Sequence, residues 1–299
     1  MPASTLQLFA VCVLIWGSTW LAITFQLDGV APEMSVGYRF LFASAVLFIY
    51  CRRRGIALAY TLGQHADFAL LGASMFGVGY IFVYYAEIHI VSGLVAVGFS
   101  TGPMINMFAA RALFGTRMTA RVAVASVLGI AGIACVFWPQ FGQVAASQSA
   151  ELGAVFTMLA VLASSAGSMA AVRNQKLGYA TWSSMAWGMF YGGALAMLIG
   201  FAMGQRLTFP PTAGYVLSLL YLSLFGSVVA FACYLTLIAR IGAAKAAYVG
   251  VMVPVFALML SSLFEGYAWS GLTSLGVALS VLGNLVLLPR SAWGRKPAT

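Results

Sequence analysis

Ten apolar stretches, each about 20 residues long, follow one another along the 299-residue chain with short polar connections. A helix needs about 20 mostly apolar residues to cross the hydrocarbon core of a bilayer. The sequence therefore predicts an all-α integral membrane protein with ten transmembrane helices. The expected spans are 5–25, 34–51, 67–86, 92–114, 121–138, 152–172, 182–203, 213–238, 244–264 and 270–288.

The composition excludes a soluble protein. Only 7% of the residues are charged and 62% are hydrophobic, whereas soluble domains carry roughly a quarter of their residues as charges. The net charge of +9 comes from short clusters between apolar stretches, so no continuous basic patch for nucleic acid is expected. The four cysteines are scattered singly without the spacing of metal ligands. We therefore predict no disulfide, no metal and no cofactor.

The basic residues predict the orientation in the membrane. Short cytoplasmic loops carry an excess of Lys and Arg. With ten spans, thirteen of the 15 Lys and Arg residues fall on the side of the amino terminus, ten of them in alternate loops and three in the carboxyl-terminal tail. Arg206 falls on the other side, and Arg39 lies within the second span. Both termini are therefore predicted to be cytoplasmic.

An internal repeat relates the two halves of the chain. Residues 92–119 resemble residues 243–270 at a shift of 151, which pairs Pro103 with Pro254 and Gly115 with Gly266. We expect one repeat over residues 1–145 and a second over 146–299. Because five spans are an odd number, the second repeat enters the membrane from the opposite side. Inverted repeats are typical of secondary transporters, although an old duplication that serves only as scaffold gives the same pattern.

Three motifs carry a family resemblance. They are Trp16–Ser18 in the first span, Gly37–Leu41 in the second, and an Ala-Ala…Pro stretch that ends at Glu265 and Gly266. In this order, with the duplicated layout, they resemble the EamA type of the drug/metabolite transporter superfamily, and more narrowly its bacterial aromatic amino-acid exporters. The first repeat departs from the pattern, because Phe114 stands where the second repeat has Glu265.

The resemblance implies a function and a location. The expected protein is a multi-pass carrier of the bacterial inner membrane, embedded in the lipid bilayer as a monomer or homodimer. It would export aromatic and other neutral amino acids, or similar small metabolites, from the cytoplasm by alternating access.

Pro103 and Pro254 are candidate hinges near the middle of the fourth and ninth spans. A proline inside a helix removes one backbone hydrogen bond and displaces the carbonyl four residues earlier, here those of Phe99 and Gly250. Freed carbonyls in a membrane need partners, so we expect them to face a cavity and to receive a substrate ammonium. A purely structural kink is the alternative.

Polar and aromatic side chains in the middle of spans are the other candidates for substrate binding. A buried tyrosine hydroxyl needs a hydrogen-bond partner, and aromatic rings suit an aromatic or cationic substrate. Core packing is the alternative for each single residue. The predicted substrate-binding residues are Trp16, Ser18, Tyr80, Tyr84, Phe99, Asn106, Tyr234, Tyr248 and Gly250.

The ionisable residues bear on energy coupling. Arg39 lies well inside its span, where a charge is either functional or extends outward to a partner such as Glu33. Glu87 and Glu265 are expected near the outer face, and no carboxylate is expected at mid-depth. We therefore predict facilitative transport, with a proton-coupled drug or metabolite efflux carrier as the alternative.

Other classes of function find less support in the sequence. A membrane-embedded enzyme is disfavoured because His65 and His89 are expected on opposite faces and catalytic motifs are absent. A channel would need a filter-like loop or a ring of charge, and the sequence has neither.

Overall fold

The computed structural model describes residues 4–115, 119–141 and 147–287, and within these ranges the chain forms helices and short connections without any strand. In the first half the helices are α1 (Thr5–Thr24), α2 (Pro32–Arg53), α3 (Leu62–Leu71), α4 (Gly79–His89), α5 (Ser92–Phe99), α6 (Gly102–Phe114) and α7 (Ala120–Phe141). In the second half they are α8 (Ser147–Lys176), α9 (Thr181–Ala202), α10 (Ala213–Leu220), α11 (Ala230–Ile241), α12 (Ala243–Ala246), α13 (Tyr248–Phe264) and α14 (Gly271–Leu287).

Two π-helical segments join α-helices end to end. Segment η1 (Gly72–Val78) connects α3 to α4, and η2 (Tyr221–Val229) connects α10 to α11. The continuous helices that result, Leu62–His89 and Ala213–Ile241, extend beyond the expected spans of 67–86 and 213–238. Eight helices of the described residues are long and apolar enough to cross a membrane, and Tyr248–Phe264 and Gly271–Val286 are shorter apolar helices. The prediction of an all-helical membrane protein is confirmed.

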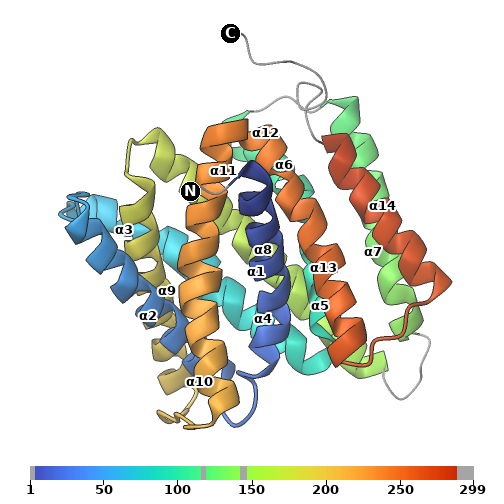
Figure 1. Cartoon of the computed structure of the whole chain (residues 1–299), viewed down its shortest axis with the longest axis horizontal. Coiled ribbons are helices and arrows are strands. Elements are labelled where there is room, and N and C mark those ends of the chain that lie inside the picture. Colours follow the sequence, from blue (N-terminus) through green and yellow to red (C-terminus); the bar gives the residue numbers. More distant parts are fainter. Residues whose placement is uncertain (1–3, 116–118, 142–146, 288–299) are drawn as a thin grey trace.

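The helices form one bundle in which successive long helices run in opposite directions. Figure 1 shows that α1 begins and α14 ends at the same end of this bundle. We call this the amino-terminal end, and it includes the α8–α9 turn. The opposite end includes the α1–α2 connection and the start of α10.

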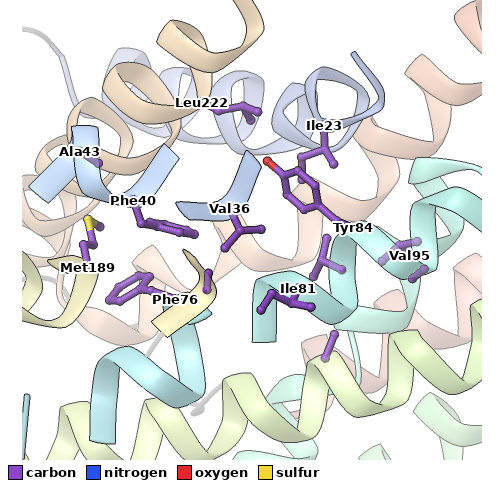
Figure 2. Packing of buried hydrophobic residues seen from close by; sticks show 14 of the residues in the cluster. Ile23, Val36, Phe40, Ala43, Phe76, Ile81, Tyr84, Val95, Met189 and Leu222 are labelled. Atoms are coloured by element: carbon purple, nitrogen blue, oxygen red, sulfur yellow. The ribbon is translucent and has the colours of Figure 1, made fainter. Parts of the chain in front are cut away.

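Apolar side chains from both halves fill the middle of the bundle. Figure 2 shows Tyr84 of α4 beside Ile23 of α1 and Val36 of α2, with Leu222 of η2 nearby. Tyr84, Val36 and Leu222 are fully buried. Because α1, α2 and α4 belong to the first half of the chain and η2 to the second, packing of this core holds the two halves together.

Small residues allow the closest helix contacts. Helices α7 and α14 pack along one another at the edge of the bundle (Figure 1). A Cβ on Gly276 would lie 2.5 Å from the carbonyl oxygen of Gly132. The small residues of the fifth and tenth spans therefore pack against each other within the chain.

Candidate functional site

A cavity of about 260 Å³ lies between α3, η1, α8, α9 and α11, toward the amino-terminal end of the bundle. Its wall is mostly apolar, with polar groups contributed by α8 and α9, where Asn174 Nδ2 donates to Ser184 Oγ at 3.0 Å. The lining also includes Gln175 and Tyr179, which lie at the end of α8 and in the α8–α9 turn. A mostly apolar cavity with few polar groups suits a small amphipathic molecule.

Aromatic rings form the inner wall of this cavity. Phe231 and Tyr234 line it, and both rings pack on Trp16 of α1 with centroid distances of 5.1 Å. The Trp16 indole nitrogen donates to the carbonyl oxygen of Gly226 at 3.1 Å. Gly226 belongs to η2, so Trp16 links the cavity wall to the π-helical segment.

Arg39 also lies near Gly226. Its Nη2 is 3.7 Å from the position that a Cβ on Gly226 would occupy. The guanidinium carbon is 4.6 Å from the centroid of the Tyr80 ring, a cation–π contact. Arg39 is only 2% exposed. Within the described part of the chain no ion pair joins it to Glu33, whose carboxylate instead accepts a hydrogen bond from Tyr85 Oη at 2.6 Å.

Buried polar atoms without partners surround Arg39. Its guanidinium acts electrostatically on the Tyr84 hydroxyl and on the Glu87 carboxylate. Among the described residues, however, Arg39 Nε and Nη1, Tyr84 Oη and both carboxylate oxygens of Glu87 have no hydrogen-bond partner. Buried polar groups are normally hydrogen-bonded, so a cluster of exceptions indicates a functional site. We call Arg39, Tyr84 and Glu87 the arginine cluster.

Glu87 lies near the end of its span, as the sequence indicated, but it is buried between helices. Glu33 is also buried. The expectation of facilitative transport depended on the depth of the carboxylates along the spans. The position of Glu87 near the end of α4 agrees with the expected depth, and the structure adds that Glu87 and Glu33 are both buried.

The predicted substrate-binding residues fall into three groups. In the first group, Tyr234 lines the cavity and Trp16 packs on it. Tyr84 belongs to the arginine cluster, and Tyr80 contacts Arg39. Phe99 packs on Trp20 with a centroid distance of 5.0 Å, and the Oδ1 atom of Asn106 is buried without a partner among the described residues. Ser18 bonds to the hydroxyl of Tyr221 in a surface groove between α1 and α10, and Tyr248 and Gly250 lie in the first turn of α13.

The two candidate hinge prolines occupy different local structures. The fourth span is broken between α5 and α6, and Pro103 lies in the first turn of α6 just after the break. Pro254 lies inside the continuous helix α13, where it is buried. At the break, the hydroxyls of Ser100 and Thr101 donate to the carbonyl oxygens three residues earlier. The carbonyl oxygen of Ser100 accepts a hydrogen bond from Asn284 Nδ2 of α14 at 3.1 Å.

The π-helical segments were missed by the sequence reasoning. A signal for them exists, because residues 74–77 (SMFG) and 223–226 (SLFG) share a Ser-x-Phe-Gly pattern at a shift of 149. Both motifs fall inside a π-helix, η1 or η2. Such segments are frequent at functional sites. Here Phe76 of η1 lines the cavity and Gly226 of η2 lies between Trp16 and Arg39.

Hydrogen bonds join the two halves at the opposite end. Glu265, at the end of α13, accepts from the Ser92 amide at 3.1 Å, from Ser92 Oγ at 2.6 Å and from Ser261 Oγ. Ser261 Oγ also accepts from the Gly93 amide at 2.8 Å. We call this group the outer latch. The shift of 151 pairs Ser92, Ser261 and Glu265 with Ala243, Ala110 and Phe114, none of which can form the same bonds.

The outer latch leads to a prediction about accessibility. We expect Glu265→Ala to increase labelling of Val95→Cys by a membrane-impermeant maleimide about tenfold, because hydrogen bonds to a charged group contribute roughly 1.5–3 kcal/mol. Val95 of α5 is fully buried, so it reacts only when this end opens. The background has the four native cysteines replaced by alanine, and Glu151→Ala, an exposed site on α8, is the control. Equal labelling rates would show that the latch does not hold this end closed.

The bundle and its site define a class of protein. A bundle of apolar helices with a cavity toward one end and buried charged groups in its interior is typical of an integral membrane transporter. The sequence profile of the EamA-like transporter family matches residues 3–138 and 151–288. The chain belongs to this family.

Known relatives agree with this assignment. The chain is similar to the uncharacterized inner membrane transporter YedA of Escherichia coli strain K12, with 28% identity over 97% of this chain and 92% of the relative. It is also similar to protein PagO of Salmonella typhimurium, with 25% identity over 94% and 91%, and to protein PecM of Dickeya dadantii, with 22% over 99% and 95%. A crystal structure shares the fold, with a TM-score of 0.67 and 17% identity over 94% of this chain and 96% of that one.

Proposed function

We propose that this protein is a secondary transporter that exports aromatic and other neutral amino acids, or similar small metabolites, from the cytoplasm. Transport proceeds by alternating access between two inverted five-helix repeats, residues 1–145 and 146–299. The observation that carries the proposal is the cavity of about 260 Å³ at the amino-terminal end, with its aromatic inner wall and the buried Arg39 beyond it.

The pattern of helix contacts supports the inverted repeats. Exchange of the halves pairs α1 with α8, α2 with α9, α5 and α6 with α12 and α13, and α7 with α14. The contact of α1 with α13 then corresponds to the contact of α8 with α5 and α6, and both contacts are present. The same exchange maps some helix pairs onto themselves, which is expected for pairs that lie around a two-fold axis. These pairs are α2–α9, α5–α13 and α7–α14, and the two helices of each pair are in contact. The π-helical segments also occupy corresponding places.

The predicted orientation is compatible with export. The basic residues predict a cytoplasmic amino terminus, and the cavity lies toward that end. In this state a cytoplasmic substrate can reach the aromatic wall while the outer latch keeps the other end closed. Exchange of the two repeat conformations would open the opposite end. The guanidinium of Arg39 suits the carboxylate of an amino acid, and the rings of Trp16 and Tyr234 suit its apolar side chain.

Counterflow in liposomes tests the proposal. We expect purified protein in vesicles loaded with unlabelled phenylalanine to take up labelled phenylalanine transiently and saturably. Tyr234→Ala should reduce this exchange several-fold because it removes a ring of the cavity wall. Tyr38→Ala is the aromatic control, because Tyr38 bonds to Thr208 near the opposite end.

The substrate panel should extend to other neutral amino acids and to hydrophobic organic cations. Exchange of organic cations without any amino acid would contradict amino-acid export and favour the drug or metabolite efflux carrier. No exchange with any compound would contradict a carrier of this class.

A further inference from the structure

Glu87 is a buried carboxylate that the proposed binding of substrate does not use. It lies two residues from the end of α4, is 8% exposed, and neither of its carboxylate oxygens has a hydrogen-bond partner among the described residues. A carboxylate charge that is removed from water without compensation is very costly. A proton on the carboxylate removes that cost, and so does a nearby cation.

The surroundings of Glu87 provide one cation and one further anion. Arg39 of α2 and Glu265 at the end of α13 act on it electrostatically. On its own helix, Tyr84 adjoins Arg39, while Tyr85 is bonded to Glu33 of α2. Helices α5 and α8 also pack against α4. At this end of the bundle, Ser92 of α5 bonds to Glu265, and Ser149 of α8 bonds to His89. Glu151 of α8 is exposed.

The position of Glu87 connects the outer latch with the cavity. Glu265 of the latch and Arg39 both act electrostatically on Glu87. From Arg39, contacts continue through Gly226 and Trp16 to Tyr234 at the cavity wall. Opening of the latch would expose Glu87 to the outer side, whereas in the present state the carboxylate is closed off from that side. A single carboxylate therefore meets two environments in the two states of the transport cycle.

We infer that Glu87 is a proton-binding site that couples export to the entry of a proton. In the outward-open state the carboxylate takes one proton from the outer side and becomes a neutral acid. After the latch closes, the proton leaves toward the cytoplasm, and Arg39 balances the carboxylate that remains. No other bond forms or breaks. This inference rests on the proposed export function.

A pH gradient across liposomes tests the coupling. We expect vesicles with an acidic interior and wild-type protein to accumulate labelled phenylalanine several-fold above the external concentration, because protons leave as substrate enters. Glu87→Gln should keep counterflow at equal pH but lose this accumulation. Glu87→Asp, which restores a carboxylate, should recover it, and Glu151→Gln should accumulate like wild type.

Three results would overturn the inference: wild-type protein that exchanges phenylalanine but never accumulates it, Glu87→Gln that accumulates it normally, or Glu87→Gln that is folded but loses counterflow as well. Infrared difference spectra between acidic and alkaline buffer provide a readout without substrate. We expect a protonated-carboxyl band that is absent from Glu87→Gln, and the same band in that variant would also contradict the assignment. Wild-type protein without any counterflow would instead contradict the proposed function, while the infrared band would still report proton binding at Glu87.

Discussion

Arg39→Met is expected to abolish counterflow and to destabilise the folded protein by about 3 kcal/mol, because it leaves a buried carboxylate without its compensating charge. Arg39 is 2% exposed, and it acts electrostatically on Glu87, whose oxygens have no hydrogen-bond partner among the described residues. The measurement is thermal unfolding in detergent, followed by counterflow of labelled phenylalanine in liposomes.

A double variant separates stability from transport. Arg39→Met combined with Glu87→Gln removes both charges, so we expect it to recover most of the lost stability while counterflow stays absent. Arg39→Lys keeps a charge but loses the planar guanidinium that lies over Tyr80, and it should be more stable than Arg39→Met. A double variant that is no more stable than Arg39→Met would show that the two charges do not compensate each other.

Gly72→Ala is expected to have the largest effect on folding of any change to a small residue in the third span. A Cβ at this position would overlap the carbonyl oxygen of Gly188, which belongs to the backbone of α9 and cannot rotate away. On the other side of the contact, a Cβ on Gly192 would lie 2.6 Å from the carbonyl oxygen of Gly72. Forcing extra atoms into such a packed site costs about 1–3 kcal/mol.

The matched control is Gly102→Ala in α6, where a Cβ would meet no atom within 4 Å. We expect Gly72→Ala to lower the temperature at which half of the protein remains monodisperse on size-exclusion chromatography, and Gly102→Ala to leave it unchanged. Equal stability of the two variants would show that η1 and α9 can move apart without cost.

The helical, membrane-spanning fold could be predicted from the sequence because hydropathy is a local property. A helix satisfies its own backbone hydrogen bonds within one segment, so an apolar stretch of about 20 residues is enough to indicate a span. The eighth stretch shows this, since the expected span of 213–238 became the helix Ala213–Ile241.

The candidate site could be predicted only in part. Mid-span aromatic residues such as Trp16 and Tyr234 were singled out by their depth, and in the structure Trp16 packs on Tyr234, which lines the cavity. Ser18 has a similar depth but faces a surface groove. Depth along a span follows from position in the sequence, whereas the side of a helix that faces a cavity depends on how its neighbours pack.

The sequence by itself determined the apolar helices, the repeat and the charge asymmetry of the loops, since each depends on residues close together in the chain or on a count. Tertiary structure alone decided that Arg39 and Glu87 are both buried and act on each other electrostatically. It also decided that Glu265 bonds to Ser92, 173 positions away, and that Asn284 caps the carbonyl of Ser100 across the bundle. The physical reason is that a polar group buried away from water needs a partner, and helix packing supplies that partner. The partner often comes from a distant segment, and the order of residues along the chain does not show which segments will pack together.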